Sequence, residues 1–123
     1  MPYQAYKLIH FLGIFSLLIA IALSAAHVLR GGTRADNPNR RLLGIVHGLA
    51  SFLILLGGFG MLARLNIVQG GLPAWVWAKL VIWVLAGASL GLVYRGAGLA
   101  KAVLVGVPML ALIAAYFALY KPF

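Results

Sequence analysis

The chain has 123 residues and a net charge of +9, yet only 9% of its residues are charged and 64% are hydrophobic. A soluble domain of this size carries about a quarter charged residues, so the composition excludes an ordinary soluble domain and indicates an integral membrane protein. The basic residues lie at the ends of apolar runs, which excludes a nucleic-acid-binding face. They are placed to anchor helices at the interface and to attract membrane lipids.

The sequence contains one acidic residue, Asp36, and no cysteine. Asp36 lies in a polar loop, so no carboxylate side chain of this chain lies within the membrane. This excludes a carboxylate proton relay and a carboxylate-bridged metal pair formed by this chain alone. The lack of cysteine excludes disulfides, thiolate metal sites and covalently attached haem. Imidazole is left as the ligand for any metal or haem.

Four apolar runs predict four transmembrane helices, because each run is long enough at 1.5 Å per residue to cross about 30 Å of hydrocarbon. The first run is too long for the apolar core of a signal peptide. We expect an all-α fold, an integral-membrane four-helix transmembrane bundle, that forms a single domain over residues 1–123. The predicted helices cover residues 4–29, 40–64, 73–94 and 99–120.

The predicted connections are short and contain helix-breaking residues. A loop rich in glycine, proline and asparagine, GGTRADNPN at 31–39, separates the first two helices. Residues 65–73 form the second connection, in which Pro73 suits the first turn of the third helix. A tight turn is expected at 95–98, and Pro108 predicts a kink in the fourth helix.

Counts of lysine and arginine orient the bundle, because short cytoplasmic loops are enriched in both. The first and third connections share six basic residues: Arg30, Arg34, Arg40, Arg41, Arg95 and Lys101. The opposite side has three: Lys7, Arg64 and Lys121. We therefore expect a multi-pass protein of the bacterial inner (cytoplasmic) membrane with both termini outside. An aromatic belt is expected on the outer side: Tyr3, Tyr6, Trp75, Trp77, Tyr116 and Tyr120.

Four polar side chains within the apolar runs are the candidate functional residues: His10, His27, His47 and Lys79. An ionisable side chain inside a membrane is a functional candidate because its burial costs free energy without a partner. His27 lies three residues inside one helix end and His47 six residues inside the next, so their depths differ by about 5 Å. His10 and Lys79 share a level near the outer face.

Each of these residues also has an interpretation that requires no ligand. His27 is within one turn of a helix end, where Ser24 could bond it, and His10 near the interface could be solvated. His47 is deeper and could bond the backbone of a neighbouring helix.

Lys79 can extend to the outer interface. Trp75 and Trp83, four residues on either side, share its helix face and allow a cation–π contact.

Three glycine patterns, Gly44-x-x-x-Gly48, Gly57-Gly58-x-Gly60 and Gly87-x-x-x-Gly91, are small-residue patterns that let transmembrane helices pack closely. We expect the helix-packing pairs Gly44/Gly48 and Gly87/Gly91 to join the chain to other membrane-protein subunits or to a second copy.

Any bound cofactor is expected to be a b-type haem, with two geometries open. His27 and His47, the candidate metal ligands, would hold it near the inner face, where Gly44 and Ser51 leave space. Alternatively, His10 and Lys79 would form the cofactor-binding site near the outer face.

Three motifs resemble a known family: Lys7-x-x-His10, an arginine pair leading to His47 with Gly57 ten residues later, and AWVWAKL at 74–80. Together they resemble the SirB-like family of small four-helix bacterial membrane proteins. More distantly, the chain is similar to HemJ-type protoporphyrinogen oxidases and to CopD-type membrane domains. The HemJ resemblance implies that His10 is tied to haem binding and Lys79 to activity.

The chain departs from these families in two places. The acidic residue of the second SirB-like helix is absent, with Ala50 near its position, and His47 has no obvious counterpart in HemJ-type chains. SirB-like proteins have no well-defined activity to carry over.

Three functions follow, in this order of preference. The first is a small accessory subunit or scaffold of a larger membrane complex, without enzymatic activity. The second is a b-type haem protein, and the third a HemJ-like oxidase. A transporter ranks lower, because four short helices without internal repeats do not build an alternating-access site unless they oligomerise.

Overall fold

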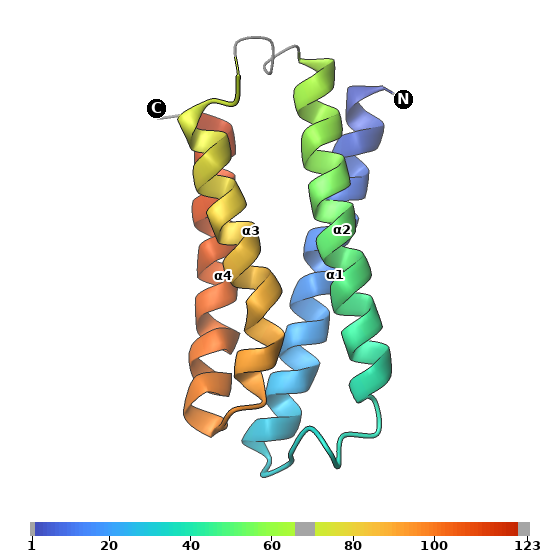
Figure 1. The fold of residues 1–123 in the computed structure, drawn as a ribbon, viewed down its shortest axis with the longest axis vertical. Helices are drawn as coiled ribbons and strands as arrows, with labels where there is room; N and C mark the ends of the chain where they lie inside the picture. Colours follow the sequence, from blue (N-terminus) through green and yellow to red (C-terminus); the bar gives the residue numbers. More distant parts are fainter. Residues whose placement is uncertain (1, 66–70, 121–123) are drawn as a thin grey trace.

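The computed structural model describes residues 2–65 and 71–120, which form four antiparallel helices (Figure 1). Each helix is long and apolar enough to cross a membrane, so the predicted fold class is confirmed. The observed ends lie within two residues of the predicted ones. The helices are α1 (Tyr3–Leu29), α2 (Arg40–Arg64), α3 (Ala74–Val93) and α4 (Ala97–Tyr120).

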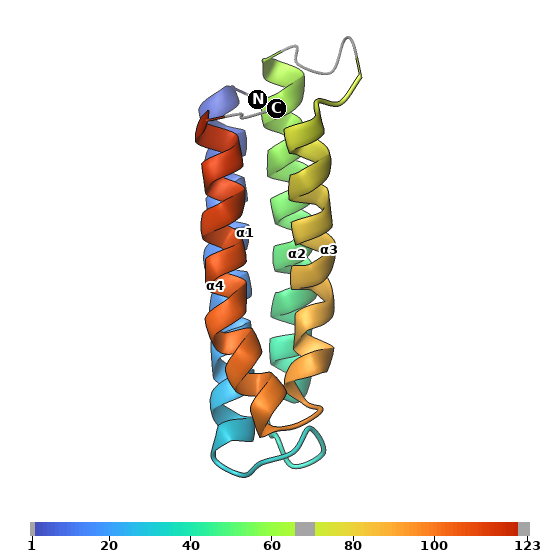
Figure 2. The ribbon, with the colours of Figure 1, turned by 90° about the vertical axis from the view of Figure 1, so that its left-hand side faces the viewer.

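The helices form two layers, with α1 and α4 in one and α2 and α3 in the other (Figure 2). The α1–α2 loop and the α3–α4 turn lie together at one end of the bundle, here called the loop end (Figure 1). The start of α1 and the end of α4 lie at the opposite end, here called the terminal end. This arrangement agrees with the sides assigned to the loops from the sequence; Lys121, which entered the basic count, lies outside the described residues.

Local sequence explains the helix ends. At the end of α1, Gly31 adopts a left-handed φ of 92°, a conformation that glycine accepts without steric cost. The Gly31 N–H then donates to the Val28 carbonyl and the Gly32 N–H to the His27 carbonyl, which closes the last turn. Pro73 immediately precedes α3, where its carbonyl accepts the Val76 N–H. Helix α4 continues through Pro108, and its first half is bent (Figure 2).

The buried core is small and divided. The main cluster lies toward the loop end, where Ile21 of α1, Val93 of α3 and Val103 of α4 pack together. A second cluster near the terminal end contains Leu62 and Trp75. Large apolar side chains cover much of the outer surface, as expected of helices that face lipid.

Glycine allows α1 and α2 to approach until backbone meets backbone. A Cβ atom at Gly13 would lie 2.8 Å from the Ala50 carbonyl oxygen, and one at Gly57 would lie 2.6 Å from the His10 backbone nitrogen. A Cβ at Gly60 would overlap the Tyr6 ring. These three contacts make up the glycine seam of the bundle.

Of the three glycine patterns in the sequence, Gly57-Gly58-x-Gly60 supplies two glycines of this seam, whereas the two glycine pairs with four-residue spacing lie outside it. A Cβ added at any glycine of these two pairs would have no heavy atom within 4 Å in the described residues. We call them the outer glycines: Gly44, Gly48, Gly87 and Gly91.

Candidate functional site

A pocket of about 130 Å³ lies between α2 and α3 in the terminal half of the bundle. Both residues of the predicted outer set, His10 and Lys79, line it. The rest of the wall is mostly apolar or aromatic. Most of it comes from α2 and α3, with single residues from the ends of α1 and α4: Tyr3, Ile54, Leu55, Gly58, Phe59, Met61, Leu62, Leu65, Trp75, Val76, Leu80, Trp83 and Ala118. The common depth predicted for His10 and Lys79 therefore corresponds to a shared pocket.

His10 is fixed by the glycine seam. Because α2 has no side chain at Gly57, the backbone of α1 lies close enough for His10 Nδ1 to bond the Ile54 carbonyl oxygen at 2.8 Å. A carbonyl only accepts, so Nδ1 carries the proton of this bond. In the neutral ring Nε2 is then the basic nitrogen, with no hydrogen bond to the described residues. This is the arrangement in which a histidine can bind a metal or accept a proton from a ligand.

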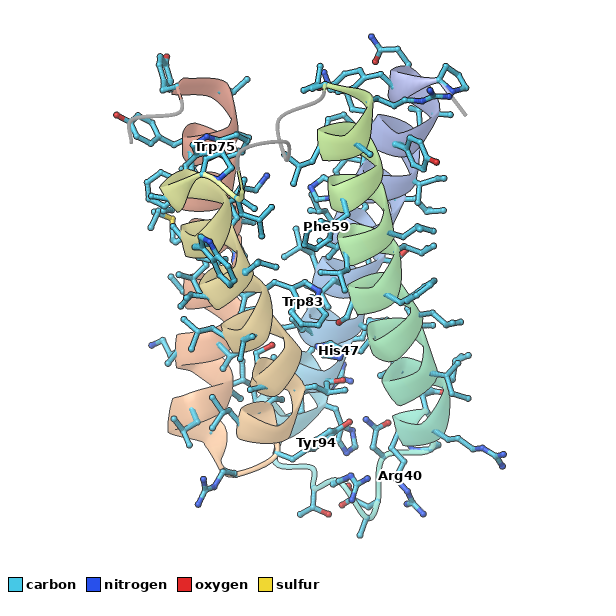
Figure 3. All side chains as sticks on the ribbon, turned by 45° about the horizontal axis from the view of Figure 1, so that its top comes forward. Arg40, His47, Phe59, Trp75, Trp83 and Tyr94 are labelled. Carbon is cyan, nitrogen blue, oxygen red and sulfur yellow. The ribbon has the colours of Figure 1, made fainter. Side chains whose placement is uncertain are left out.

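Lys79 is half-buried on α3, between Trp75 one turn before it and Trp83 one turn after it. All three side chains line the pocket, as their spacing predicts. The Trp83 indole Nε1–H donates to the Ser51 carbonyl oxygen at 2.9 Å, which ties α3 to α2 at the inner end of the pocket. Figure 3 shows Trp83 between the two helices and Trp75 toward the terminal end of α3.

His47 forms a second tie between α2 and α3, one turn closer to the loop end. It is buried, and its Nε2–H donates to the Ala86 carbonyl oxygen at 3.2 Å (Figure 3). The Ser89 hydroxyl donates to the same carbonyl at 2.6 Å, and the Ser51 hydroxyl donates to the His47 carbonyl at 2.9 Å. We call this group, with Trp83, the α2–α3 polar contact. The bond from His47 to a neighbouring backbone is the interpretation that requires no ligand.

His27 is held by the α1–α2 loop. Its Nε2 lies 2.7 Å from Asp36 Oδ1 and 2.9 Å from the Thr33 carbonyl oxygen. A Cβ at Gly32 would overlap the His27 ring, so this glycine gives the imidazole its place over the loop. The Thr33 backbone N–H, followed by the His27 side chain, holds the pKa of Asp36 below its ordinary value.

The structure brings together His10 and Lys79 but not His27 and His47. The second pair has separate partners, Asp36 and Ala86, and neither histidine lines the pocket. Ser24, considered as a partner for His27, is fully buried, and its hydroxyl makes no hydrogen bond within the described ranges. No cluster of three metal-ligating side chains occurs in residues 2–65 and 71–120.

The sequence did not predict the hydrogen bonds that Trp83 and the α1–α2 loop make. Trp83 entered only as an aromatic neighbour of Lys79, whereas its N–H bonds Ser51 across the helix interface. Asn37 also escaped notice; it is buried and donates from Nδ2 to the Tyr94 hydroxyl at 2.9 Å, which fastens the α1–α2 loop to the end of α3. The sequence signal that could have pointed to Asn37 is its place directly before Pro38 in the polar loop.

Comparison of the chain with protein-family models, with curated proteins and with solved structures gave no match.

Proposed function

We propose that this protein is a small integral-membrane subunit or scaffold of a larger assembly in a bacterial inner membrane. The supporting observation is the difference between its two sets of glycines. The glycine seam is filled by neighbouring helices of the same chain, whereas the outer glycines face open space. In a membrane, small residues stabilise helix association by allowing close approach of another helix.

The outer glycines belong to one surface. Helical rotation of about 100° per residue puts each pair beside the α2–α3 polar contact. Helices α2 and α3 lie in one layer, opposite the layer of α1 and α4 (Figure 2). We infer from the helical rotation that both pairs lie on the side of this layer that faces away from α1 and α4. A partner helix laid along this surface would meet four positions without side chains. The partner is either a different membrane subunit or a second copy of this chain.

The test is the size of the particle after gentle detergent extraction. We expect a particle larger than one chain, and we expect the double variant Gly48→Leu, Gly91→Leu to release the monomer. The open space at both positions means that the added side chains do not disturb the chain's own packing. Gly106→Leu is the matched control, because Gly106 also faces open space but lies on α4. A uniform wild-type monomer, or a particle unaffected by the double variant, would contradict the proposal.

The proposed orientation has both termini outside. It is supported by six basic residues at the loop end against three on the other side. Cysteines introduced at the exposed residues Gln4 and Thr33 should differ in whole cells: an impermeant thiol reagent should label position 4 and spare position 33. The reverse pattern would invert the topology.

A b-type haem protein related to SirB-like or HemJ-type chains is the second candidate. The His10 ring favours it, because Nδ1 is bonded to a carbonyl and Nε2 is the basic nitrogen, as in a metal-ligating imidazole. The pocket does not fit the macrocycle: about 130 Å³ is close to the roughly 150 Å³ of a cavity that holds benzene. A haem would require α2 and α3 to separate. If this second candidate holds, purified protein shows a Soret band that His10→Ala abolishes and His47→Ala leaves intact. Absence of the band under adequate haem supply removes this candidate.

A further inference from the structure

The pocket between α2 and α3 combines an apolar wall with one lysine side chain. Among the described residues of its lining, Lys79 is the only lysine or arginine, and most of the other lining side chains are apolar or aromatic. A ligand that matches both features has an anionic group for the ammonium and a hydrocarbon part for the wall. A fully polar anion would leave the wall unused, and a plain hydrocarbon would leave Lys79 without an electrostatic contribution to binding.

The size of the pocket limits the hydrocarbon part to one chain or one ring. Its volume of about 130 Å³ resembles that of a cavity that encloses a single benzene ring. A two-chain phospholipid cannot enter with both chains. The pocket is partly open, so the remainder of a long single chain can extend along the lipid-facing surface.

The pocket also has the right depth for an amphiphile. It extends from Tyr3 and Leu65 at the terminal end to Trp83. From Trp75 to Trp83 the axis of α3 advances about 12 Å, and Lys79 is midway. A head group at Lys79 would therefore lie about one turn below the level of Trp75. Its chain would run deeper toward Trp83, parallel to the chains of the surrounding lipids.

His10 of α1 and Gly58 of α2 lie next to each other in the wall opposite α3. The bond to Ile54 fixes the His10 imidazole, which offers a second polar group close to a ligand's head. Gly58 leaves space in front of this ring: a Cβ there would lie 3.6 Å from His10 Cε1, an ordinary contact. A larger side chain at Gly58 would thus project into the pocket without forcing the helices apart.

We infer that this pocket binds a single-chain anionic amphiphile, with its carboxylate or phosphate head at Lys79 and its alkyl chain against the tryptophan-lined wall. This site does not depend on the proposed subunit role, because the outer glycines form no part of its lining.

Tryptophan quenching by a brominated ligand tests the inference. The chain has three tryptophans, of which Trp75 and Trp83 line the pocket and Trp77 does not. The experiment uses the full chain with Trp77→Phe in nonionic detergent, titrated with dibromostearate and with its neutral methyl ester. We expect saturable quenching by the acid at concentrations about tenfold lower than by the ester, because a charge-assisted hydrogen bond contributes at least that factor.

Two variants locate the site. Lys79→Gln should weaken binding of the acid about tenfold, whereas Lys79→Arg should retain it. Gly58→Leu should abolish saturable quenching by filling the pocket, whereas Gly48→Leu, on the same helix but outside the lining, should not. Helical circular dichroism verifies that each variant is folded.

The outcomes separate the possible head groups and the alternative. A brominated lysophosphatidate that binds better than the fatty acid identifies phosphate as the head group, and the reverse identifies carboxylate; both support the site. Equal affinity of acid and ester, no effect of Lys79→Gln, or saturable quenching that persists in Gly58→Leu would each overturn it.

Discussion

Helix α2 contacts two neighbours in different ways. Against α1 it packs through the glycine seam, where Gly13 and Gly57 bring one backbone against the other. Against α3 it is held by the α2–α3 polar contact. From Trp83 toward the terminal end, a pocket lies between the two helices. Both interfaces lie in the same apolar bundle, so hydrophobicity does not explain the difference. In membranes close packing and interhelical hydrogen bonds take the place of the hydrophobic driving force. Helix α2 combines close backbone packing with the His10–Ile54 hydrogen bond on the α1 side, and relies on side-chain hydrogen bonds on the α3 side.

The largest expected effect comes from filling the glycine seam. In Gly57→Leu the new Cβ would lie 2.6 Å from the His10 backbone nitrogen, and a backbone cannot rotate out of the way as a side chain can. We expect a loss of about 3 kcal/mol or more in the free energy of unfolding, measured by denaturant titration in mixed micelles. Gly48→Leu is the control on the same helix and should have little effect. Equal stability of the two variants would show that the seam does not hold α1 and α2 together.

This contrast also shows how far sequence reasoning extends. The number of helices and their ends follow from apolar runs bounded by arginine, proline and glycine. The glycines that pack within the chain follow only in part. Gly57-Gly58-x-Gly60 is a small-residue pattern like Gly44-x-x-x-Gly48, but neither pattern tells which of the two packs within the chain, and Gly13 belongs to no such pattern. Helices that are apolar on every side give no periodic signal to tell a lipid-facing side from a helix-facing one.

The candidate site was predictable in depth but not in lateral position. Counting residues from helix ends puts His10 level with Lys79, and both line one pocket. The same count puts His27 near the level of His47, yet the two bond different partners. Depth depends only on the helical rise, whereas lateral position depends on how each helix is rotated about its axis. Asp36 as the partner of His27 depends on the turn at Gly31, which a loop composition does not specify.

The second largest effect is expected at the α2–α3 polar contact. His47→Leu removes the bond to Ala86, and Trp83→Phe removes the bond to Ser51. Hydrogen bonds between transmembrane helices contribute on average about 0.6 kcal/mol and at most about 1.7, so each variant should lose about 1 kcal/mol.

The double variant His47→Leu, Trp83→Phe tests how strongly α3 is held against α2, compared with α1 on the other side. If the two bonds act together to hold α3 against α2, the combined loss should differ from the sum of the single losses. Strict additivity would show that the bonds act independently. A loss as large as that of Gly57→Leu would show that α3 depends on polar contacts as strongly as α1 depends on glycine.

A smaller effect is expected from two buried serines with opposite roles. Ser89 donates a hydrogen bond to the Ala86 carbonyl, whereas the Ser24 hydroxyl, 0% exposed on α1, has no acceptor among the described residues. Ser89→Ala should therefore reduce stability by about 0.5 kcal/mol. Ser24→Ala should be neutral or stabilising by up to about 1 kcal/mol, because it removes a buried polar group without a partner. A clear loss of stability in Ser24→Ala would reveal a bond to that hydroxyl.

The smallest effect is expected at the loop that closes the α1–α2 side. The Thr33 N–H and His27 lower the pKa of Asp36 from its ordinary value of 3.8. A carboxyl whose pKa is lower in the folded state contributes stability above the unfolded pKa, and this contribution is lost as the pH falls through the folded pKa. The thermal midpoint of the wild type should therefore fall below pH 3.8 by slightly more than that of Asp36→Asn, which cannot ionise. Both should be compared in the same detergent from pH 6 to pH 3. Asp36 is exposed, so solvent screens its contacts and the difference in thermal midpoint between the two proteins should be small. A loss of stability as large as that expected at the α2–α3 polar contact would mean that the loop, and not only the glycine seam, holds α1 against α2.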